Sequence, residues 1–238
     1  MSSKSHFFIG GFNPLSLNPV IYLNASKGVN LNNNNEVISL NDLSGNGYNF
    51  QSAINTGNLP TIQNNGINGN KSILLNGSYL ENTDTYTQIT DLNIIFYWVV
   101  FKLQGAPTSG YQNILIQGVL DYSNAGINAS QLNNINSNSI FQFNFSNNNI
   151  DRNVIDGFLT PKFAILNKLQ NDVNYNLNNF VPQPRIGTYQ ISNTNTFIGS
   201  WRNNNANMLF SEYGVLNYTP TQQQINNLLQ YFNQKYNL

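Results

Sequence analysis

The chain has 238 residues, and only 8% of them are charged, with ten basic and ten acidic side chains in balance. Because binding to a nucleic-acid backbone depends on clustered lysine and arginine, this balance excludes DNA and RNA as main partners. The longest apolar run, 94–101, is far shorter than the roughly twenty residues of a membrane span, so none is expected. The 40% of hydrophobic residues suffices to bury a core, which predicts a folded domain.

Residues 1–19 are predicted to form an N-terminal arm, and residues 20–238 the domain itself. The apolar patch 7–9 is shorter than the core of a signal peptide, so classical secretion is not expected. We expect the arm to anchor the domain to a partner or to a neighbouring copy. The alternative is an N-terminal strand that folds onto its own domain.

Short apolar or alternating runs, separated by Gly, Asn, Ser and Pro, recur along most of the chain. This pattern predicts an all-β fold, a two-sheet antiparallel jelly-roll sandwich. The run 94–103 is apolar on both faces, which is typical of a central strand covered on both sides. The expected strands are 20–23, 37–40, 72–75, 79–80, 94–103, 114–117, 141–145, 196–198 and 209–216.

The C-terminus changes to the period of a helix, predicted from about Pro220 to Tyr236. Thr219 is the expected N-cap, with Pro220 at the first helical position and Gln222 completing a capping box. The apolar face of this helix is expected to pack against the sandwich. Its residues at i, i+3, i+4 and i+7 are Ile225, Leu228, Leu229 and Phe232.

Several sequence blocks, in order, resemble the concanavalin A-like, laminin G-like domains often found in virion and cell-surface proteins. They are NPLSLNPVIYLNAS (13–26), NDLSGNGYNF (41–50), GINGNKSILLNGSYL (66–80) and the closing segment 196–236. The region 111–185 has no counterpart in this resemblance. The resemblance implies the same sandwich fold that the strand pattern predicts.

The sequence departs from the family pattern at Asn24, where the family often has Asp, and at Leu40, where it often has Trp. Both changes remove groups that would otherwise be candidates for a site. Glu212 matches a glutamate of the family's penultimate strand, and the resemblance implies that it serves packing and hydrogen bonding. In the turn 42–47, Asp42 is expected to accept backbone N–H groups, while the glycines permit positive φ.

The sequence predicts no cofactor. Domains of this class sometimes hold Ca²⁺ at a rim of the sandwich, so calcium is kept as the alternative. Hard cations prefer paired carboxylates, and no two acids stand in a DxD arrangement. The acids in predicted loops are Asp42, Asp84, Asp91 and Asp121.

The sequence also predicts that the protein is not an enzyme. Glycosidases need two carboxyl groups about 5–10 Å apart, and none of the three glutamates lies near another acid in such a motif. His6 is the only histidine and lies in the predicted arm. A Ser-His-Asp or Cys-His site therefore lacks its base.

The leading functional hypothesis is a virion surface structural protein of a bacteriophage, such as a capsid decoration, head-fibre or tail-fibre protein that also binds host glycans. Sparse charge suits a surface that packs against other virion proteins or copies of itself, and the lack of cysteine and of an expected secretion signal suits a protein assembled inside a host cell. The expected location is therefore the virion, assembled in the host cytoplasm without a signal peptide. The alternative is a cellular carbohydrate-binding or adhesion module with an extracellular location.

Sugar-binding proteins stack aromatic rings on apolar sugar faces while neighbouring amides bind the hydroxyl groups. Trp201 is the first candidate, because Arg202 and Asn203 follow it directly in a predicted loop. Tyr111 and Tyr122 flank a second polar region and are further candidates. The alternative for each ring is packing onto the edge of the sandwich.

Overall fold

A computed structural model of the chain describes most of its sequence. The described residues are 11–54, 57–82, 94–104, 111–117, 130–135, 140–145, 148–153, 162–169, 172–177, 185–186, 196–199 and 206–238. Within these ranges no helix is long and apolar enough to cross a membrane.

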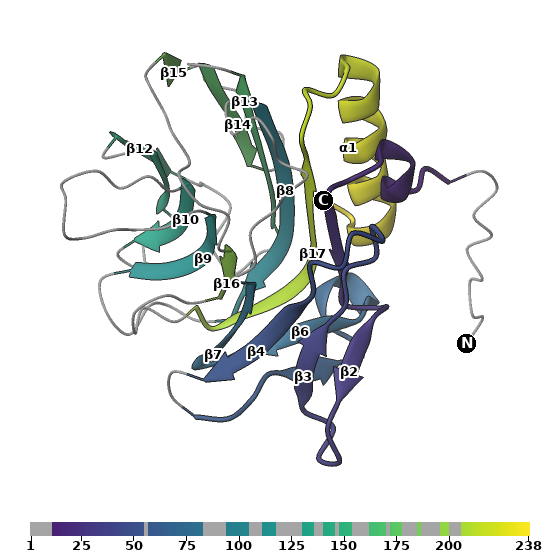
Figure 1. Ribbon diagram of the computed structural model, residues 1–238. Helices are drawn as coiled ribbons and strands as arrows, with labels where there is room; N and C mark the ends of the chain where they lie inside the picture. The colour runs from purple at the N-terminus through teal and green to yellow at the C-terminus, as the bar shows by residue number, and fades with distance from the viewer. Residues whose placement is uncertain are drawn as a thin grey trace.

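Two β-sheets form the body of the domain, and every pairing between neighbouring strands is antiparallel (Figure 1). The first sheet runs, in spatial order, β15 (Arg185–Ile186), β14 (Asp172–Leu177), β13 (Lys162–Leu169), β8 (Ile94–Leu103), β17 (Met208–Leu216), β6 (Ser72–Leu75) and β5 (Thr61–Gln63), with β1 (Ile21–Asn24) paired to β17. The second runs β12 (Asn148–Asn153), β11 (Ile140–Phe145), β10 (Ser130–Ile135), β9 (Tyr111–Gln117), β16 (Thr196–Ile198), β7 (Ser78–Asn82), β4 (Phe50–Ile54), β3 (Val37–Leu40) and β2 (Val29–Leu31).

The predicted two-sheet antiparallel sandwich is therefore confirmed, and each of the nine expected strands lies within or overlaps an observed one. The strands 37–40, 72–75, 94–103 and 196–198 have the predicted bounds. The region 111–185, which matched nothing in the family pattern, supplies strands to the far ends of both sheets.

The central strand β8 has apolar side chains on both faces because each face packs on a different layer. Tyr97, Val99 and Phe101 belong to the core between the two sheets. Phe96 and Trp98 point to the opposite side and pack under the helix. The predicted burial of this strand on both faces is confirmed.

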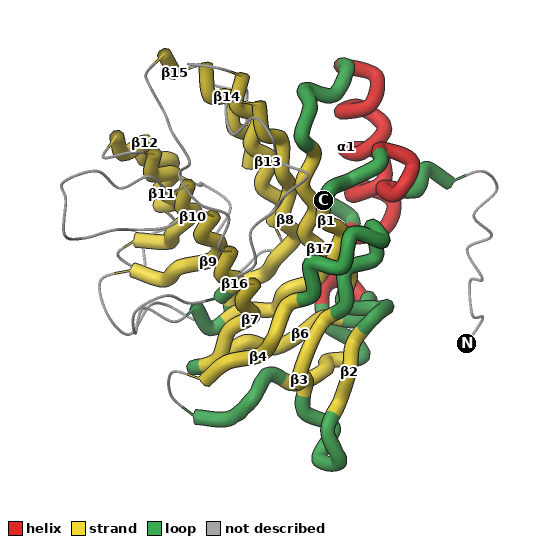
Figure 2. Tube along the Cα trace, in the orientation of Figure 1, coloured by secondary structure: helices red, strands yellow, loops and turns green. Residues whose placement is uncertain are grey.

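The helix α1 (Gln222–Tyr236) covers the outer face of the first sheet, beside the short 3-10 helix η1 (Pro14–Leu17) (Figure 2). Leu228, Phe232 and Tyr236 form its buried stripe. The apolar spacing of the sequence therefore predicted the packed face.

The predicted N-cap is wrong by two residues. Thr221, not Thr219, caps the helix, and its capping box closes with Gln224. Both threonines precede a glutamine by three residues, so the sequence alone fits either register. Pro220 is buried before the cap instead of opening the helix, and Tyr218 just upstream donates to the carbonyl of Leu17. Because this preceding segment packs against the domain, the first turn of α1 begins two residues later than predicted.

The cap register gives a direct test. Thr221→Ala should lower the free energy of unfolding by about 1 kcal/mol, because Thr221 Oγ1 accepts from the N–H of Gln224 at 3.3 Å. The exposed Thr219 is the matched control, and Thr219→Ala should change stability by less than about 0.5 kcal/mol. Urea unfolding of both variants measures the difference. A larger loss of stability for Thr219→Ala than for Thr221→Ala would show that Thr219 is the N-cap.

The turn after β3 fastens the start of β1. The carboxylate of Asp42 accepts N–H groups of Tyr22, Ser44 and Tyr48, as well as the hydroxyl of Ser44. Gly45 and Gly47 have φ of 92° and 84°, in the region that favours glycine. The predicted role of this turn is confirmed.

Residues 11–19 of the predicted arm lie against the domain. Leu17 is buried in the layer under α1, and the ring of Phe12 meets the edge of the Tyr231 ring at 6.4 Å between centroids. Residues 1–10 lie outside the described part of the chain. The anchoring role predicted for the arm stays a prediction.

Candidate functional site

A polar cluster lies buried between α1 and the first sheet, centred on Glu212 of β17. The register of β17 against β8 shifts between Phe210 and Glu212, which is a β-bulge. Because of the extra residue, Phe210 and Tyr213 both face the core between the sheets. Glu212 is thereby turned towards the helix, where its side chain is 0% exposed.

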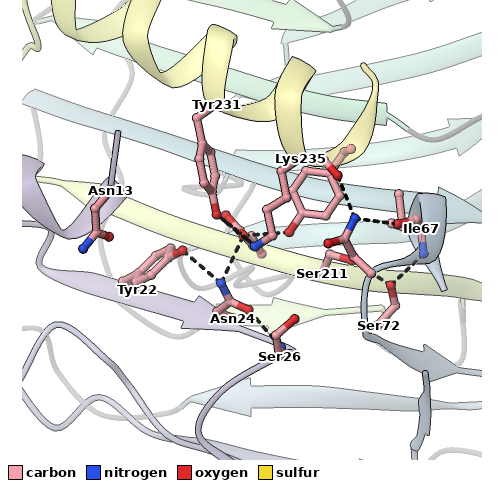
Figure 3. A network of polar contacts seen from close by, with 12 residues as sticks. Asn13, Tyr22, Asn24, Ser26, Ile67, Ser72, Ser211, Tyr231 and Lys235 are labelled. Carbon is pink, nitrogen blue, oxygen red and sulfur yellow. Dashed lines mark hydrogen bonds and ion pairs between the residues drawn. The ribbon is translucent and has the colours of Figure 1, made fainter. Parts of the chain in front are cut away.

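One oxygen of Glu212 collects four donors (Figure 3). The hydroxyl groups of Tyr231 and Tyr236 each donate to Oε1 at 2.6 Å, and the amide of Asn24 donates at 3.1 Å. Lys235 completes the set with an ion pair. Tyr231 and Lys235 reach the same carboxylate because residues four apart lie on one face of a helix.

The second oxygen of Glu212, Oε2, is buried and has no hydrogen-bond partner among the described residues. The cluster extends sideways through Asn24, whose amide also donates to the hydroxyl of Tyr22 at 3.1 Å. The side-chain oxygen of Asn24 accepts the N–H of Ser26 at 2.8 Å. Asn24 therefore connects the buried carboxylate to the turn that follows β1.

The three tyrosines of the cluster resist ionisation. Burial raises the pKa of Tyr22, Tyr231 and Tyr236, and the negative charge of Glu212 raises each of them further. At neutral pH all three phenols therefore stay protonated. Tyr231 and Tyr236 serve as donors to the carboxylate, and the hydroxyl of Tyr22 accepts from Asn24.

Above this cluster a pocket of about 880 Å³ opens between α1, the segment 11–15, β1 and the loop around the 3-10 helix η2 (Ile67–Gly69). Seven of its eighteen lining residues carry a side-chain amide, and no aspartate or glutamate is among them. Phe12, Tyr22 and Tyr231 supply aromatic rings. The amides are Asn13, Asn24, Asn68, Asn70, Asn233, Gln234 and Asn237.

These amides divide into structural and free ones. Asn68 and Asn70 donate to the carbonyl oxygens of Tyr236 and Lys235, and so they tie the η2 loop to the end of the helix. Asn233 and Gln234 are exposed on the last turn of α1. No hydrogen bond joins their side chains to the described residues. The pocket thus has walls joined by hydrogen bonds, and it has side-chain amides that make no hydrogen bond to the described residues.

The structure does not test the ligand residues predicted from the sequence. Tyr111 is the first residue of β9. Tyr122, Trp201, Arg202 and Asn203 lie outside the described residues. Their predicted role in binding stays a prediction.

Sequence reasoning did not select the pocket residues Tyr231, Lys235 and Asn233, although their spacing on the predicted helix was visible. The role that the resemblance implies for Glu212, packing and hydrogen bonding, agrees with the structure. Asn24, which the sequence comparison treated as the loss of a site carboxylate, is here a donor to Glu212. A carboxylate at this position would face another one instead.

Asp42, one of the four acids considered for calcium, has both oxygens engaged by backbone and hydroxyl donors. A cation would have to displace these bonds. Asp84, Asp91 and Asp121 lie outside the described residues. Within the described part of the chain, no three acidic, histidine or cysteine side chains gather in a way that could hold a metal ion.

No family model matches the chain, and no curated protein matches it either. Solved structures do match its fold. A Trypanosoma rangeli sialidase in complex with sialic acid aligns with a TM-score of 0.61 at 12% identity, over 90% of this chain and 32% of the sialidase chain. The chain thus spans about a third of that protein.

Two botulinum neurotoxin structures match over 90% of this chain and 52% of theirs, at 13% identity. One is a type C neurotoxin that depends on interaction with two ganglioside molecules to enter cells, with a TM-score of 0.60. The other is the binding domain of neurotoxin DC in complex with SialylT, with a TM-score of 0.61. At such low identity the likeness shows the fold alone. The chain has a two-sheet jelly-roll sandwich fold, similar to the fold of the matched parts of the sialidase and the neurotoxins.

Proposed function

We propose that this protein is a non-catalytic glycan-binding module and that the pocket between α1 and β1 is its binding site. The observation that carries the proposal is the lining of this pocket, which combines seven amide side chains with three aromatic rings and includes no acid among the described lining residues. Such a lining complements a sugar, which has hydroxyl groups around an apolar ring face.

Each component of the pocket has a partner on a sugar. A side-chain amide both donates and accepts hydrogen bonds, as a hydroxyl group does. Asn233 and Gln234 are free for this task. The ring of Phe12 is partly exposed beside Tyr231, so an apolar surface lies next to the amides.

The compared structures support this class of ligand. The sialidase holds sialic acid, and the type C neurotoxin interacts with gangliosides. The low identity carries no residue of those sites over to this chain. It supports a jelly-roll sandwich as a scaffold on which sugar sites occur.

The absence of catalysis is also part of the proposal. Hydrolysis of a glycosidic bond ordinarily uses two carboxyl groups placed on either side of it. Glu212, the carboxylate below the pocket, is fully buried behind Tyr231 and Lys235, and its Oε1 already receives four donors. The raised pKa of Tyr231 also opposes its use as a phenolate nucleophile.

A glycan array tests the proposal. The wild-type protein should bind a defined set of oligosaccharides, and the double variant Asn233→Ala/Gln234→Ala should lose about tenfold in affinity, because several hydrogen bonds of about 0.5–1.5 kcal/mol each are removed. Gln230→Ala is the control, since Gln230 is exposed on the same helix but does not line the pocket. Equal binding by the double variant and the wild type would exclude this pocket.

We further propose, as the setting for this binding, the surface of a virion, where the protein would be a capsid or fibre component. Its 8% of charged residues supports this setting, since a neutral surface suits close packing among many copies. A cellular adhesion module is the alternative. Mass spectrometry of purified virions separates the two, and absence of the protein from the particles would remove the virion role.

A further inference from the structure

A second pocket, of about 510 Å³, lies next to the first. It opens at one edge of the sandwich, where residues of β2 from one sheet meet Ile62 of β5 from the other. Both pockets are lined by Ser26 and Lys27, in the turn between β1 and β2. The two pockets therefore flank one turn.

The charged residues that line the two pockets are all lysines. Lys27 lines both pockets, and Lys71 lines the second one. Both side chains are exposed, and neither makes a hydrogen bond or an ion pair with the described residues. The third lysine nearby, Lys235, differs because Glu212 balances its charge.

Acids are absent from the described residues that line either pocket. Glu36 follows Asn35 of the second pocket, but its carboxylate accepts from the amide of Asn32 at 2.8 Å and is not part of the lining. In a chain with ten basic residues, two unbalanced lysines around one turn are a local excess of positive charge. This excess favours an anionic ligand.

The turn that presents Lys27 is held rigidly. The backbone N–H of Lys27 donates to the carbonyl of Asn24 at 2.9 Å, and the side-chain amide of Asn24 donates a hydrogen bond to Glu212. Gly28, with φ of 73°, comes so close to Asn41 that an added Cβ would meet its carbonyl oxygen at 3.1 Å. A preorganised cation loses less entropy on binding than one on a mobile loop.

We infer that the two pockets form one extended site for an anionic oligosaccharide, whose carboxylate or sulfate groups pair with Lys27 at the centre and Lys71 at the far end. This inference rests on the proposed glycan binding and adds the ligand class and the length of the site. One sugar unit would occupy the amide-lined pocket and the next would cross the turn. The contacts of both lysines are charge-assisted, so they discriminate acidic sugars from neutral ones.

The test uses an array of matched pairs, in which sialylated, uronic acid-containing and sulfated oligosaccharides stand beside their uncharged parents. The acidic member of at least one pair should bind about tenfold more tightly than its parent, and Lys27→Gln should remove this difference. Lys71→Gln should reduce it in part. Lys102→Gln, which removes the same charge from β8 outside both pockets, should leave it unchanged.

Raising the salt concentration from about 50 mM to about 500 mM should weaken binding of the acidic member and spare its parent, because salt screens charges at exposed sites. Equal binding of both members, or an unchanged preference in Lys27→Gln, would overturn the anionic site while leaving glycan binding intact. Binding to no sugar of the array would overturn the proposed function as well. Circular dichroism of each variant verifies that the fold is retained.

Discussion

Glu212→Ala should lower the free energy of unfolding by about 3–5 kcal/mol, the usual loss when one partner of a buried ion pair is removed. The change leaves the donors of Lys235, Tyr231 and Tyr236 without their common acceptor. Because these donors lie on the last two turns of α1, we expect the helix end to separate from the sheet first. Urea unfolding measures the loss.

Two further variants separate the charge from the hydrogen bonds. Glu212→Gln keeps an acceptor of the same shape and should cost less than Glu212→Ala. In Glu212→Ala/Lys235→Met the unpaired cation is gone too, so the double variant should be more stable than the sum of the single changes predicts. Glu81→Ala, at a half-exposed glutamate of β7, is the control. A loss below about 1 kcal/mol for Glu212→Ala would contradict the role of the cluster.

The protein should unfold steeply in alkali. In the unfolded chain the tyrosines ionise near their ordinary pKa of 10.0, whereas in the folded protein burial and Glu212 raise the pKa of Tyr22, Tyr231 and Tyr236. Their contribution to stability is therefore complete below pH 10 and is lost as the pH rises above it. Above pH 10, each group should lower the free energy of unfolding by about 1.4 kcal/mol per pH unit. The three groups together should lower it by about 4 kcal/mol per pH unit.

Urea unfolding between about pH 8 and about pH 11.5 measures this slope, and the absorbance of phenolate follows ionisation. Tyr231→Phe removes one of these groups, so its slope above pH 10 should be shallower by about 1.4 kcal/mol per pH unit. Between pH 8 and pH 9 these groups should not change the free energy of unfolding of the wild type or of Tyr231→Phe. Ionisation of every tyrosine near pH 10 in a chain that stays folded would contradict the burial of the cluster.

Much of the fold could be predicted because local patterns carry it. The run 94–103 reads as a strand buried on both faces, and it is the centre of the first sheet. The glycines after Asp42 indicated a tight turn, and both adopt positive φ. The apolar spacing of 225–232 identified the face of α1 that packs on the sheet.

The N-cap of α1 is a feature that local sequence patterns could not predict. Thr219 and Thr221 each precede a suitable glutamine, and only the docking of Tyr218 and Pro220 decides between them. The strands of 111–185 lacked any family pattern, and their places at the ends of the two sheets depend on pairing with β8 and β16. Long-range pairing has no local signal.

By itself, the sequence determined the sandwich, its central strand and the helical face, since these depend on the period of apolar residues along neighbouring positions. Only the tertiary structure decided the candidate site. Asn24 and Glu212 are separated by 188 residues, and they meet because β1 pairs with β17. The β-bulge at Ser211 turns Glu212 from the core towards α1, and Tyr231 and Lys235 reach it from above. Each of these residues is ordinary in its own segment, and its chemistry arises from neighbours that only the folded chain supplies.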